Sequence, residues 1–139
     1  MTFTSDSPDQ TRNIARELAG RLNPGRVILL QGDLGAGKTA FTRGFMSHWD
    51  LDDWVSSPTF TIMNEYKNAS ILVYHFDLYR MEQEEELIEL GVDDYLDSGD
   101  FILIEWPGLA RDWLPDDCVT VDLKLGQSEF QRIITITGE

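Results

Sequence analysis

Glycines, a lysine and a threonine gather at residues 32–39 in a pattern suited to phosphate binding. The segment reads Gly-Asp-Leu-Gly-Ala-Gly-Lys-Thr, which matches the P-loop motif in full. Glycines in such a loop let successive backbone N–H groups point at phosphate oxygens. Lys38 can then reach the β- and γ-phosphates, and the hydroxyl of Thr39 can bind Mg²⁺. The motif therefore predicts a site for a nucleoside triphosphate with magnesium.

The elements on either side of this loop have the order that a P-loop requires. Residues 26–31 contain Val-Ile-Leu-Leu, an apolar run typical of a strand buried on both faces. A helix is expected from Lys38 to His48, and the positive end of its dipole favours phosphate. The residues predicted to contact the nucleotide here are Asp33, Leu34, Gly35, Ala36, Gly37, Lys38, Thr39 and Ala40.

Two carboxylates that end predicted strands are candidates for the chemistry. Glu105 follows the apolar run Phe101–Ile104, and Asp77 ends a less uniformly apolar strand. P-loop proteins organise Mg²⁺ with a carboxylate at the end of a second buried strand, so we predict Glu105 and Thr39 as metal ligands. Asp77 is predicted to orient the attacking water or to brace the metal's surroundings. The candidate catalytic residues are Lys38, Asp77 and Glu105, although a surface acid at a strand end is an alternative for each carboxylate.

Other residues near these strand ends are candidates for supporting roles. Ser56–Thr59, named here the switch-like loop, follows the P-loop helix. In phosphate-switch proteins a loop at this place senses the γ-phosphate, so Thr59 is the candidate sensor. Trp106 follows Glu105 directly and either stacks on a partner or substrate or caps the edge of the core. His75 lies inside a predicted strand, which favours a structural role.

The remaining segments predict a single α/β domain over residues 1–139. A helix is expected to begin at Ser7 and Pro8, with Gln10 completing a capping box. The other predicted elements are strands at Thr59–Lys67, Ile71–Leu78 and Phe101–Glu105, an acidic helix at Met81–Leu90, and a terminal hairpin on a sheet edge made by Cys118–Leu125 and Gln131–Thr137. This order predicts a P-loop NTPase-like three-layer sandwich with a mostly parallel central sheet and antiparallel edge strands.

Charge and hydropathy restrict the partners. The chain has 25 acids against 11 bases, a net charge of −14. Non-specific binding to nucleic acid rests on Lys and Arg neutralising phosphates, so a partner is expected to hold any nucleic acid. No apolar run approaches the roughly 20 residues needed to cross a bilayer, and the N-terminus lacks the features of a signal peptide. We therefore expect a cytoplasmic protein without a membrane contact.

Four separated segments together resemble the bacterial TsaE (YjeE) family over nearly the whole chain. They are Gly-Asp-Leu-Gly-Ala-Gly-Lys-Thr, Ser-Ser-Pro-Thr-Phe-Thr, Tyr-His-Phe-Asp-Leu-Tyr-Arg and Ile-Glu-Trp-Pro, in that order. The resemblance implies a small ATPase needed to make threonylcarbamoyladenosine in tRNAs that read codons starting with A. It implies ATP as the nucleotide and Mg²⁺ on Thr39 and Glu105.

The resemblance also implies partners and further roles. Family members associate with the TsaB–TsaD complex and use ATP hydrolysis to reset it between cycles, so the ATPase would be slow alone and stimulated by partners. The tRNA would be held by those partners. Asp77 and Trp106 correspond to residues implicated in hydrolysis and partner contact. The adenine would be held partly by the N-terminal segment near Thr4–Pro8, with Pro8 as the candidate contact.

Two other functions are compatible with the phosphate site. A small-molecule kinase of this fold usually adds a lid that carries arginines, and the sequence has no Arg-rich insertion. A nucleotide-binding module that never hydrolyses is the second alternative. Phosphate transfer to a small acceptor would indicate the kinase, whereas lasting retention of bound ATP with Mg²⁺ and partners would indicate the module.

Overall fold

A seven-stranded sheet forms the centre of the molecule. The computed structural model describes residues 1–33 and 35–139, and the strands lie in the order β1-β7-β6-β2-β5-β4-β3. The four central strands β6, β2, β5 and β4 are parallel, with antiparallel strands on both sides. The strands are β1 (Thr2–Ser5), β2 (Arg26–Gln31), β3 (Met63–Lys67), β4 (Leu72–Asp77), β5 (Phe101–Glu105), β6 (Val119–Leu125) and β7 (Arg132–Thr137).

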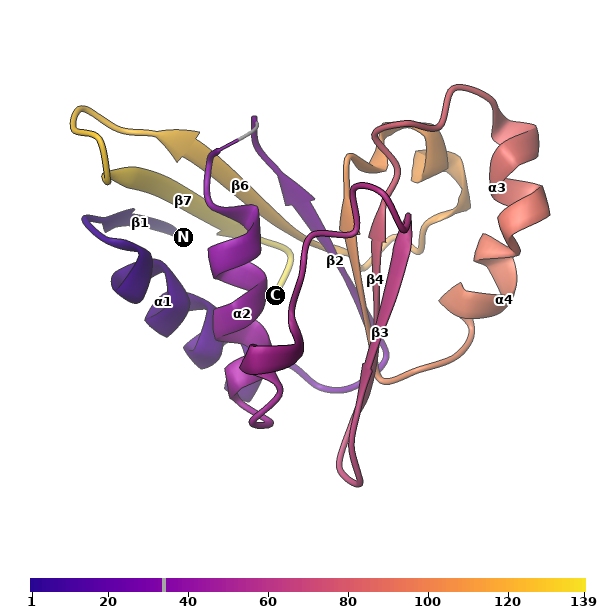
Figure 1. Cartoon of the computed structure of the whole chain (residues 1–139), viewed down its shortest axis with the longest axis horizontal. Coiled ribbons are helices and arrows are strands. Elements are labelled where there is room, and N and C mark those ends of the chain that lie inside the picture. The colour runs from indigo at the N-terminus through magenta and orange to yellow at the C-terminus, as the bar shows by residue number, and fades with distance from the viewer. Residues whose placement is uncertain (34) are drawn as a thin grey trace.

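Helices cover both faces of this sheet. Helices α1 (Pro8–Arg21) and α2 (Lys38–Ser47) lie on one side, and α3 (Glu84–Leu90) and α4 (Val92–Leu96) lie on the other (Figure 1). Two 3₁₀ segments, η1 (Asp52–Trp54) and η2 (Pro107–Trp113), complete the chain. A separate apolar cluster fills the space on each side of the sheet. The predicted three-layer α/β sandwich is therefore confirmed.

The elements that carry the site form for local reasons. Ser7 caps α1, since its hydroxyl accepts a hydrogen bond from the amide of Gln10 at 3.1 Å, and Pro8 occupies the first turn. The four apolar residues of β2, Val27–Leu30, are all buried, as a strand with neighbours on both faces requires. Among the described residues, no helix combines the length and apolarity needed to cross a membrane.

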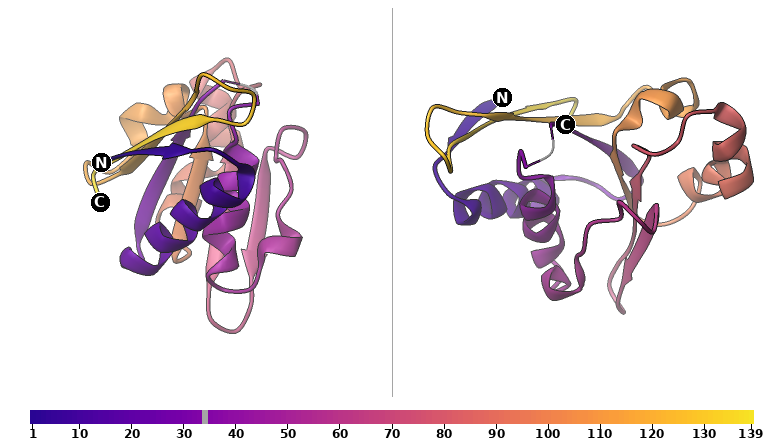
Figure 2. Two further views of the ribbon diagram at one scale, coloured as in Figure 1. Left: turned by 90° about the vertical axis from the view of Figure 1, so that its left-hand side faces the viewer. Right: turned by 45° about the horizontal axis from the view of Figure 1, so that its top comes forward.

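The predicted terminal hairpin is confirmed, since β6 and β7 pair antiparallel, but its predicted place on the sheet edge is wrong. Strand β6 pairs in parallel with β2, inside the sheet. Strand β7 pairs with β1, formed by residues for which no strand was expected, and β1 is the outer strand. Figure 2 shows β1, β7 and β6 side by side, with α1 packed beneath them. The N-terminal strand was missed because four residues show too little alternation to be distinguished from a loop.

Two predicted boundaries are also wrong. The strand expected from Thr59 begins at Met63, because Ile62 donates from its amide to the carbonyl of Pro58 at 2.7 Å and closes a turn. The helix expected from Met81 begins at Glu84, where Gln83 and Glu86 form a capping box. Its predicted end is confirmed, since Gly91 adopts a left-handed conformation with φ of 78°.

A candidate nucleotide site

The described residues of the loop between β2 and α2 have conformations that suit a phosphate cradle. Gly37 precedes α2 with φ of 104°, a left-handed conformation that glycine adopts without a steric penalty. Gly32 is needed for a different reason, because a Cβ there would lie 2.6 Å from the carbonyl oxygen of Leu123 on β6. The first turn of α2 leaves N–H groups free to donate to an anion. The loop is therefore shaped for phosphate oxygens.

Lys38 lies in the middle of a polar cluster, although it is only 7% exposed. Its ammonium donates to the carbonyl of Gly32 at 2.8 Å and lies 3.9 Å from Oε1 of Glu105. It also lies 4.0 Å from the centroid of the Trp106 ring. Burial lowers the pKa of Lys38, and the negative charges of Glu105 and Asp77 act in the opposite direction. A bound polyphosphate would place negative charge next to this partly desolvated ammonium and so favour its charged form.

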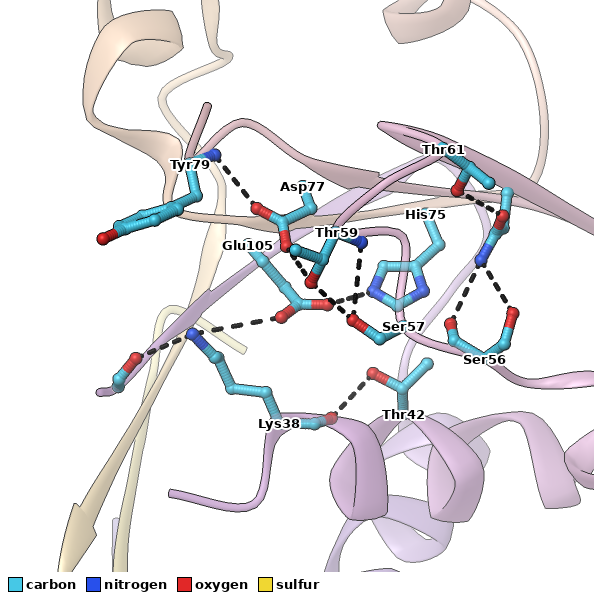
Figure 3. Close-up of polar contacts among 12 residues, drawn as sticks. Lys38, Thr42, Ser56, Ser57, Thr59, Thr61, His75, Asp77, Tyr79 and Glu105 are labelled. Carbon is cyan, nitrogen blue, oxygen red and sulfur yellow. Dashed lines mark hydrogen bonds and ion pairs between the residues drawn. The ribbon is translucent and has the colours of Figure 1, made fainter. Parts of the chain in front are cut away.

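Glu105 contacts a buried histidine, His75. Oε2 of Glu105 lies 2.6 Å from Nε2 of His75, and both residues are at most 4% exposed. The hydroxyl of Tyr66 lies 3.0 Å from Nδ1 of His75 and 3.1 Å from the carbonyl oxygen of Ser56. Burial raises the pKa of Tyr66, so this phenol stays protonated at neutral pH. A chain of polar contacts thus connects Glu105 with the start of the switch-like loop, and Figure 3 shows its first link, between Glu105 and His75.

Asp77 contacts the other end of the same loop. The register of β4 and β5 places it directly beside Glu105. Its Oδ2 accepts from the hydroxyl of Thr59 at 3.1 Å, and its Oδ1 accepts from the amide of Tyr79 at 2.9 Å. The hydroxyl of Thr59 lies 2.7 Å from that of Ser57. Asp77 therefore fixes the candidate γ-phosphate sensor at the mouth of the site.

The structure brings most of the predicted site residues to one cavity of about 220 Å³. This phosphate cavity lies where the parallel strands β4 and β5 end, which is the usual ligand crevice of an open α/β sheet. Its lining residues are Gly35, Gly37, Lys38, Thr39, Ser57, Thr59, Asp77, Glu105 and Trp106. The three candidate catalytic residues, both candidate metal ligands and the candidate sensor are all among them.

The residues at this cavity fit a nucleotide with magnesium. The Thr39 hydroxyl and the Glu105 carboxylate are hard oxygen donors of the kind that Mg²⁺ prefers, and Lys38 supplies positive charge for the phosphates. Within residues 1–33 and 35–139, no group of three or more His, Cys, Asp or Glu side chains forms a metal site. A magnesium ion at a P-loop takes further ligands from phosphate oxygens and water, so two protein oxygens suffice.

A second pocket, of about 620 Å³, adjoins the phosphate cavity. Asp33 and Ala36 of the P-loop line it on one side, and Tyr79 and Leu125 line it from the other elements. Trp106 lines both spaces, and its ring packs on that of Tyr79 with centroids 4.9 Å apart. Trp106 therefore forms a wall between the phosphate cavity and an open, partly apolar surface.

Two other predicted contacts, Ala40 and Pro8, do not line either space. Ala40 is half-buried in the first turn of α2, and Pro8 is exposed at the start of α1. Leu34 lies outside the described residues. The segment before Pro8 approaches the P-loop indirectly, since Asp6 accepts from Gln131 at 3.3 Å and the neighbouring Arg132 donates to the carbonyl of Gly35 at 3.1 Å.

Sequence reasoning missed two polar residues at the site, Arg132 and Tyr66, and considered a third, His75, only as a structural residue. Arg132 contacts the P-loop from β7, and Tyr66 and His75 support Glu105 from β3 and β4. The one available signal was the polar pair itself, because Tyr66 and His75 occupy buried positions of the two strands β3 and β4, which pair with each other. Their pairing depends on strand register, which a hairpin prediction with uncertain ends cannot fix.

The chain is similar to proteins of one family. A model of the family described as threonylcarbamoyl adenosine biosynthesis protein TsaE matches residues 5–134. The protein named tRNA threonylcarbamoyladenosine biosynthesis protein TsaE from Bacillus subtilis is 41% identical over 132 residues, which are 95% of this chain and 82% of that protein. The protein of the same name from Rickettsia bellii is 38% identical over 135 residues, covering 96% and 92%.

A solved structure agrees with these sequence matches. The crystal structure of YdiB from Bacillus subtilis superposes with a TM-score of 0.79 at 33% identity, over 99% of this chain and 84% of that one. The fold, the sequence matches and the P-loop motif thus point to the same group of proteins. The chain therefore belongs to the TsaE family.

Proposed function

We propose that this chain is a magnesium-dependent ATPase that serves the synthesis of threonylcarbamoyladenosine in tRNA. The observation that carries the proposal is the convergence of Lys38, Thr39, Thr59, Asp77 and Glu105 on one cavity at the ends of parallel strands. Membership of the TsaE family supports the biological setting, because the named relatives are tRNA threonylcarbamoyladenosine biosynthesis proteins. The family also supports adenine as the base.

The proposed roles follow from position. The backbone of the P-loop and the ammonium of Lys38 bind the phosphates, with Lys38 stabilising charge that develops on the transferring group. Thr39 and Glu105 hold Mg²⁺, which when bound neutralises phosphate charge. Lys38 already lies 3.9 Å from Oε1 of Glu105, so cation and carboxylate face the same space before the nucleotide arrives.

Asp77 and Thr59 are assigned to the attacking water. One oxygen of Asp77 accepts from the Thr59 hydroxyl and the other from the Tyr79 amide. These two donors fix the orientation of the carboxylate, which remains able to accept a proton from a water through its other lone pairs. Because Thr59 belongs to the switch-like loop, loss of the γ-phosphate would change the contacts of that loop.

The proposed partners are the TsaB and TsaD proteins, with tRNA contacted only through them. The net charge of −14 disfavours direct, non-specific binding to nucleic acid. Trp106 is the proposed contact, since it lines both the phosphate cavity and the open 620 Å³ pocket and would thus face both a bound nucleotide and the surface. A partner seated there would sense the nucleotide and promote its hydrolysis, in the cytoplasm.

The test is steady-state ATP hydrolysis with and without a purified TsaB–TsaD complex. We expect slow release of inorganic phosphate from the chain with Mg²⁺, a clear increase with the complex, and no activity in Lys38→Ala. An unchanged rate with the complex would contradict the switch role. Phosphate on a small acceptor would instead establish a kinase, and ATP that stays bound intact for hours with Mg²⁺ and partners would establish a non-hydrolysing module.

A further inference from the structure

His75 is a buried polar residue that the proposed reaction does not use. It lies in the interior of β4 and is 1% exposed. Both ring nitrogens of a histidine in such a place require hydrogen-bond partners, because burying a polar group without a partner costs free energy. Both nitrogens have a partner, and each partner leads to a part of the phosphate site.

The first partner is Glu105. An ionised carboxylate only accepts hydrogen bonds, so Nε2 of His75 donates to Oε2 across 2.6 Å. This contact occupies Oε2 on the side away from the cavity and leaves Oε1 turned toward the ammonium of Lys38, 3.9 Å away. Figure 3 shows the two carboxylate oxygens pointing in these different directions. Glu105 is thus held in one rotation with one free oxygen.

The second partner is Tyr66, on the neighbouring strand β3. Its hydroxyl lies 3.0 Å from Nδ1 of His75 and 3.1 Å from the carbonyl oxygen of Ser56. The tyrosine is 3% exposed, and its contact with His75 is buried. Since Ser56 opens the switch-like loop, the chain of contacts from Glu105 ends at the same loop whose Thr59 contacts Asp77.

We infer that His75 is a positioning residue for the proposed magnesium site. It restrains Glu105 so that Oε1 is the oxygen presented to the metal, and Tyr66 ties this restraint to the switch-like loop. The inference rests on the proposed function, because it concerns the carboxylate assigned there to Mg²⁺. Partners that orient a metal ligand typically change metal affinity or activity by about 10- to 100-fold when removed.

The test separates orientation from folding by comparing His75→Gln with His75→Met. The amide of glutamine can donate to Glu105 from a place close to Nε2, whereas methionine fills similar volume without a donor. Mn²⁺ affinity in the presence of ADP is measured by electron paramagnetic resonance, and ADP affinity is measured in EDTA. Hydrolysis is measured against Mg²⁺ concentration, and thermal unfolding is recorded without ligand. His48→Gln is the matched control, because His48 is the second of the two histidines and is exposed on the far end of α2.

We expect His75→Met to weaken Mn²⁺ binding about 10- to 100-fold and to raise the Mg²⁺ concentration for half-maximal hydrolysis similarly. ADP affinity in EDTA should stay within about threefold of wild type, and His75→Gln should recover most of the metal affinity.

If His75→Met does not fold, Tyr66→Phe and His75→Gln still test the inference, with a smaller loss expected in Tyr66→Phe. Unchanged Mn²⁺ affinity in all three variants would overturn the inference. Equal losses of Mn²⁺ affinity in His75→Gln and His75→Met would also overturn it, provided that the two variants unfold at the same temperature. Absence of Mg²⁺-dependent hydrolysis in the wild-type protein would instead overturn the proposed function.

Discussion

The ammonium of Lys38 lies over the indole ring of Trp106, with Nζ 4.0 Å from the ring centroid. A cation over an aromatic face is attracted by the ring quadrupole, but a triphosphate offers the same ammonium a full negative charge. The two groups therefore compete for Lys38. Because Trp106 also packs on Tyr79 and lines the open pocket, a bound nucleotide would change the contacts of Trp106 at the surface where a partner is proposed to bind.

The first prediction is that nucleotide binding changes the fluorescence of Trp106. Moving the ammonium from the ring to the phosphates alters the charge next to the indole, so adding ADP with Mg²⁺ should shift the emission. The signal should disappear in Trp106→Phe, although nucleotide still binds in equilibrium dialysis. Trp54→Phe is the control, because Trp54 is 74% exposed on η1 and should leave the signal intact. A full signal in Trp106→Phe would exclude this origin.

The second prediction concerns the pH dependence of nucleotide binding. Burial lowers the pKa of Lys38 from its ordinary value of 10.5, against the opposing charges of Glu105, Asp77 and Asp33. The ammonium is therefore lost at a lower pH than in an exposed lysine, so ADP affinity in EDTA should fall as pH rises, with a midpoint below 10.5. Above the midpoint the fall should approach about tenfold per pH unit.

Lys38→Arg tests whether this titration belongs to Lys38. A guanidinium keeps its charge throughout this range but has a different shape, so binding should be weaker at neutral pH and lack the alkaline decline. The affinities can be followed with a fluorescent ADP analogue between pH 7 and 10. An equal decline in Lys38→Arg would assign the titration to another group.

The third prediction distinguishes the two neighbouring carboxylates. Glu105→Gln removes the charge proposed to hold Mg²⁺, so the gain in ADP affinity on adding Mg²⁺ should be lost, while ADP binding in EDTA changes little. Asp77→Asn should keep the Mg²⁺ gain but reduce hydrolysis by about 10²- to 10⁴-fold, as expected when a general base is removed. Calorimetric titrations with ADP, run with Mg²⁺ and with EDTA, measure the gain directly.

A control variant, and the result that would exchange the roles of the two carboxylates, complete this comparison. Glu65→Gln removes an exposed carboxylate from β3 and should affect neither property. If the Mg²⁺ gain survives in Glu105→Gln and vanishes in Asp77→Asn, the two carboxylates exchange their proposed roles.

Local patterns in the sequence predicted the parts of the site that lie close together along the chain. The P-loop motif identified the β2–α2 connection, and the apolar run before Glu105 identified β5, because both signals are contained in a few consecutive residues. Parallel strands place their ends at one edge of a sheet, so the approach of Asp77 to Glu105 could also be anticipated. The residue pairing that produces it is now seen in the register of β4 and β5.

Contacts that depend on long-range pairing could not be predicted in the same way. Strand β1 exists because it pairs with β7 more than 125 residues away in the chain, as in the pair Thr2 and Thr135. The His75–Glu105 contact likewise joins two strands across 30 positions. A histidine in a strand favours a structural role when it is considered by itself, and only its distance from a carboxylate reveals a possible part in the site.

The last prediction concerns the helix that carries the P-loop. Gly44 of α2 packs against α1 so closely that a Cβ would overlap the carbonyl oxygen of Arg12. Because the obstacle is backbone, Gly44→Ala should force the two helices apart and destabilise the fold by about 1–3 kcal/mol or more. Since α2 begins at Lys38, ADP affinity should fall as well. Gly108→Ala is the control, because a Cβ at Gly108 meets nothing within 4 Å. Urea unfolding of both variants measures the difference, and equal stabilities would show that α1 and α2 adjust to the extra methyl group.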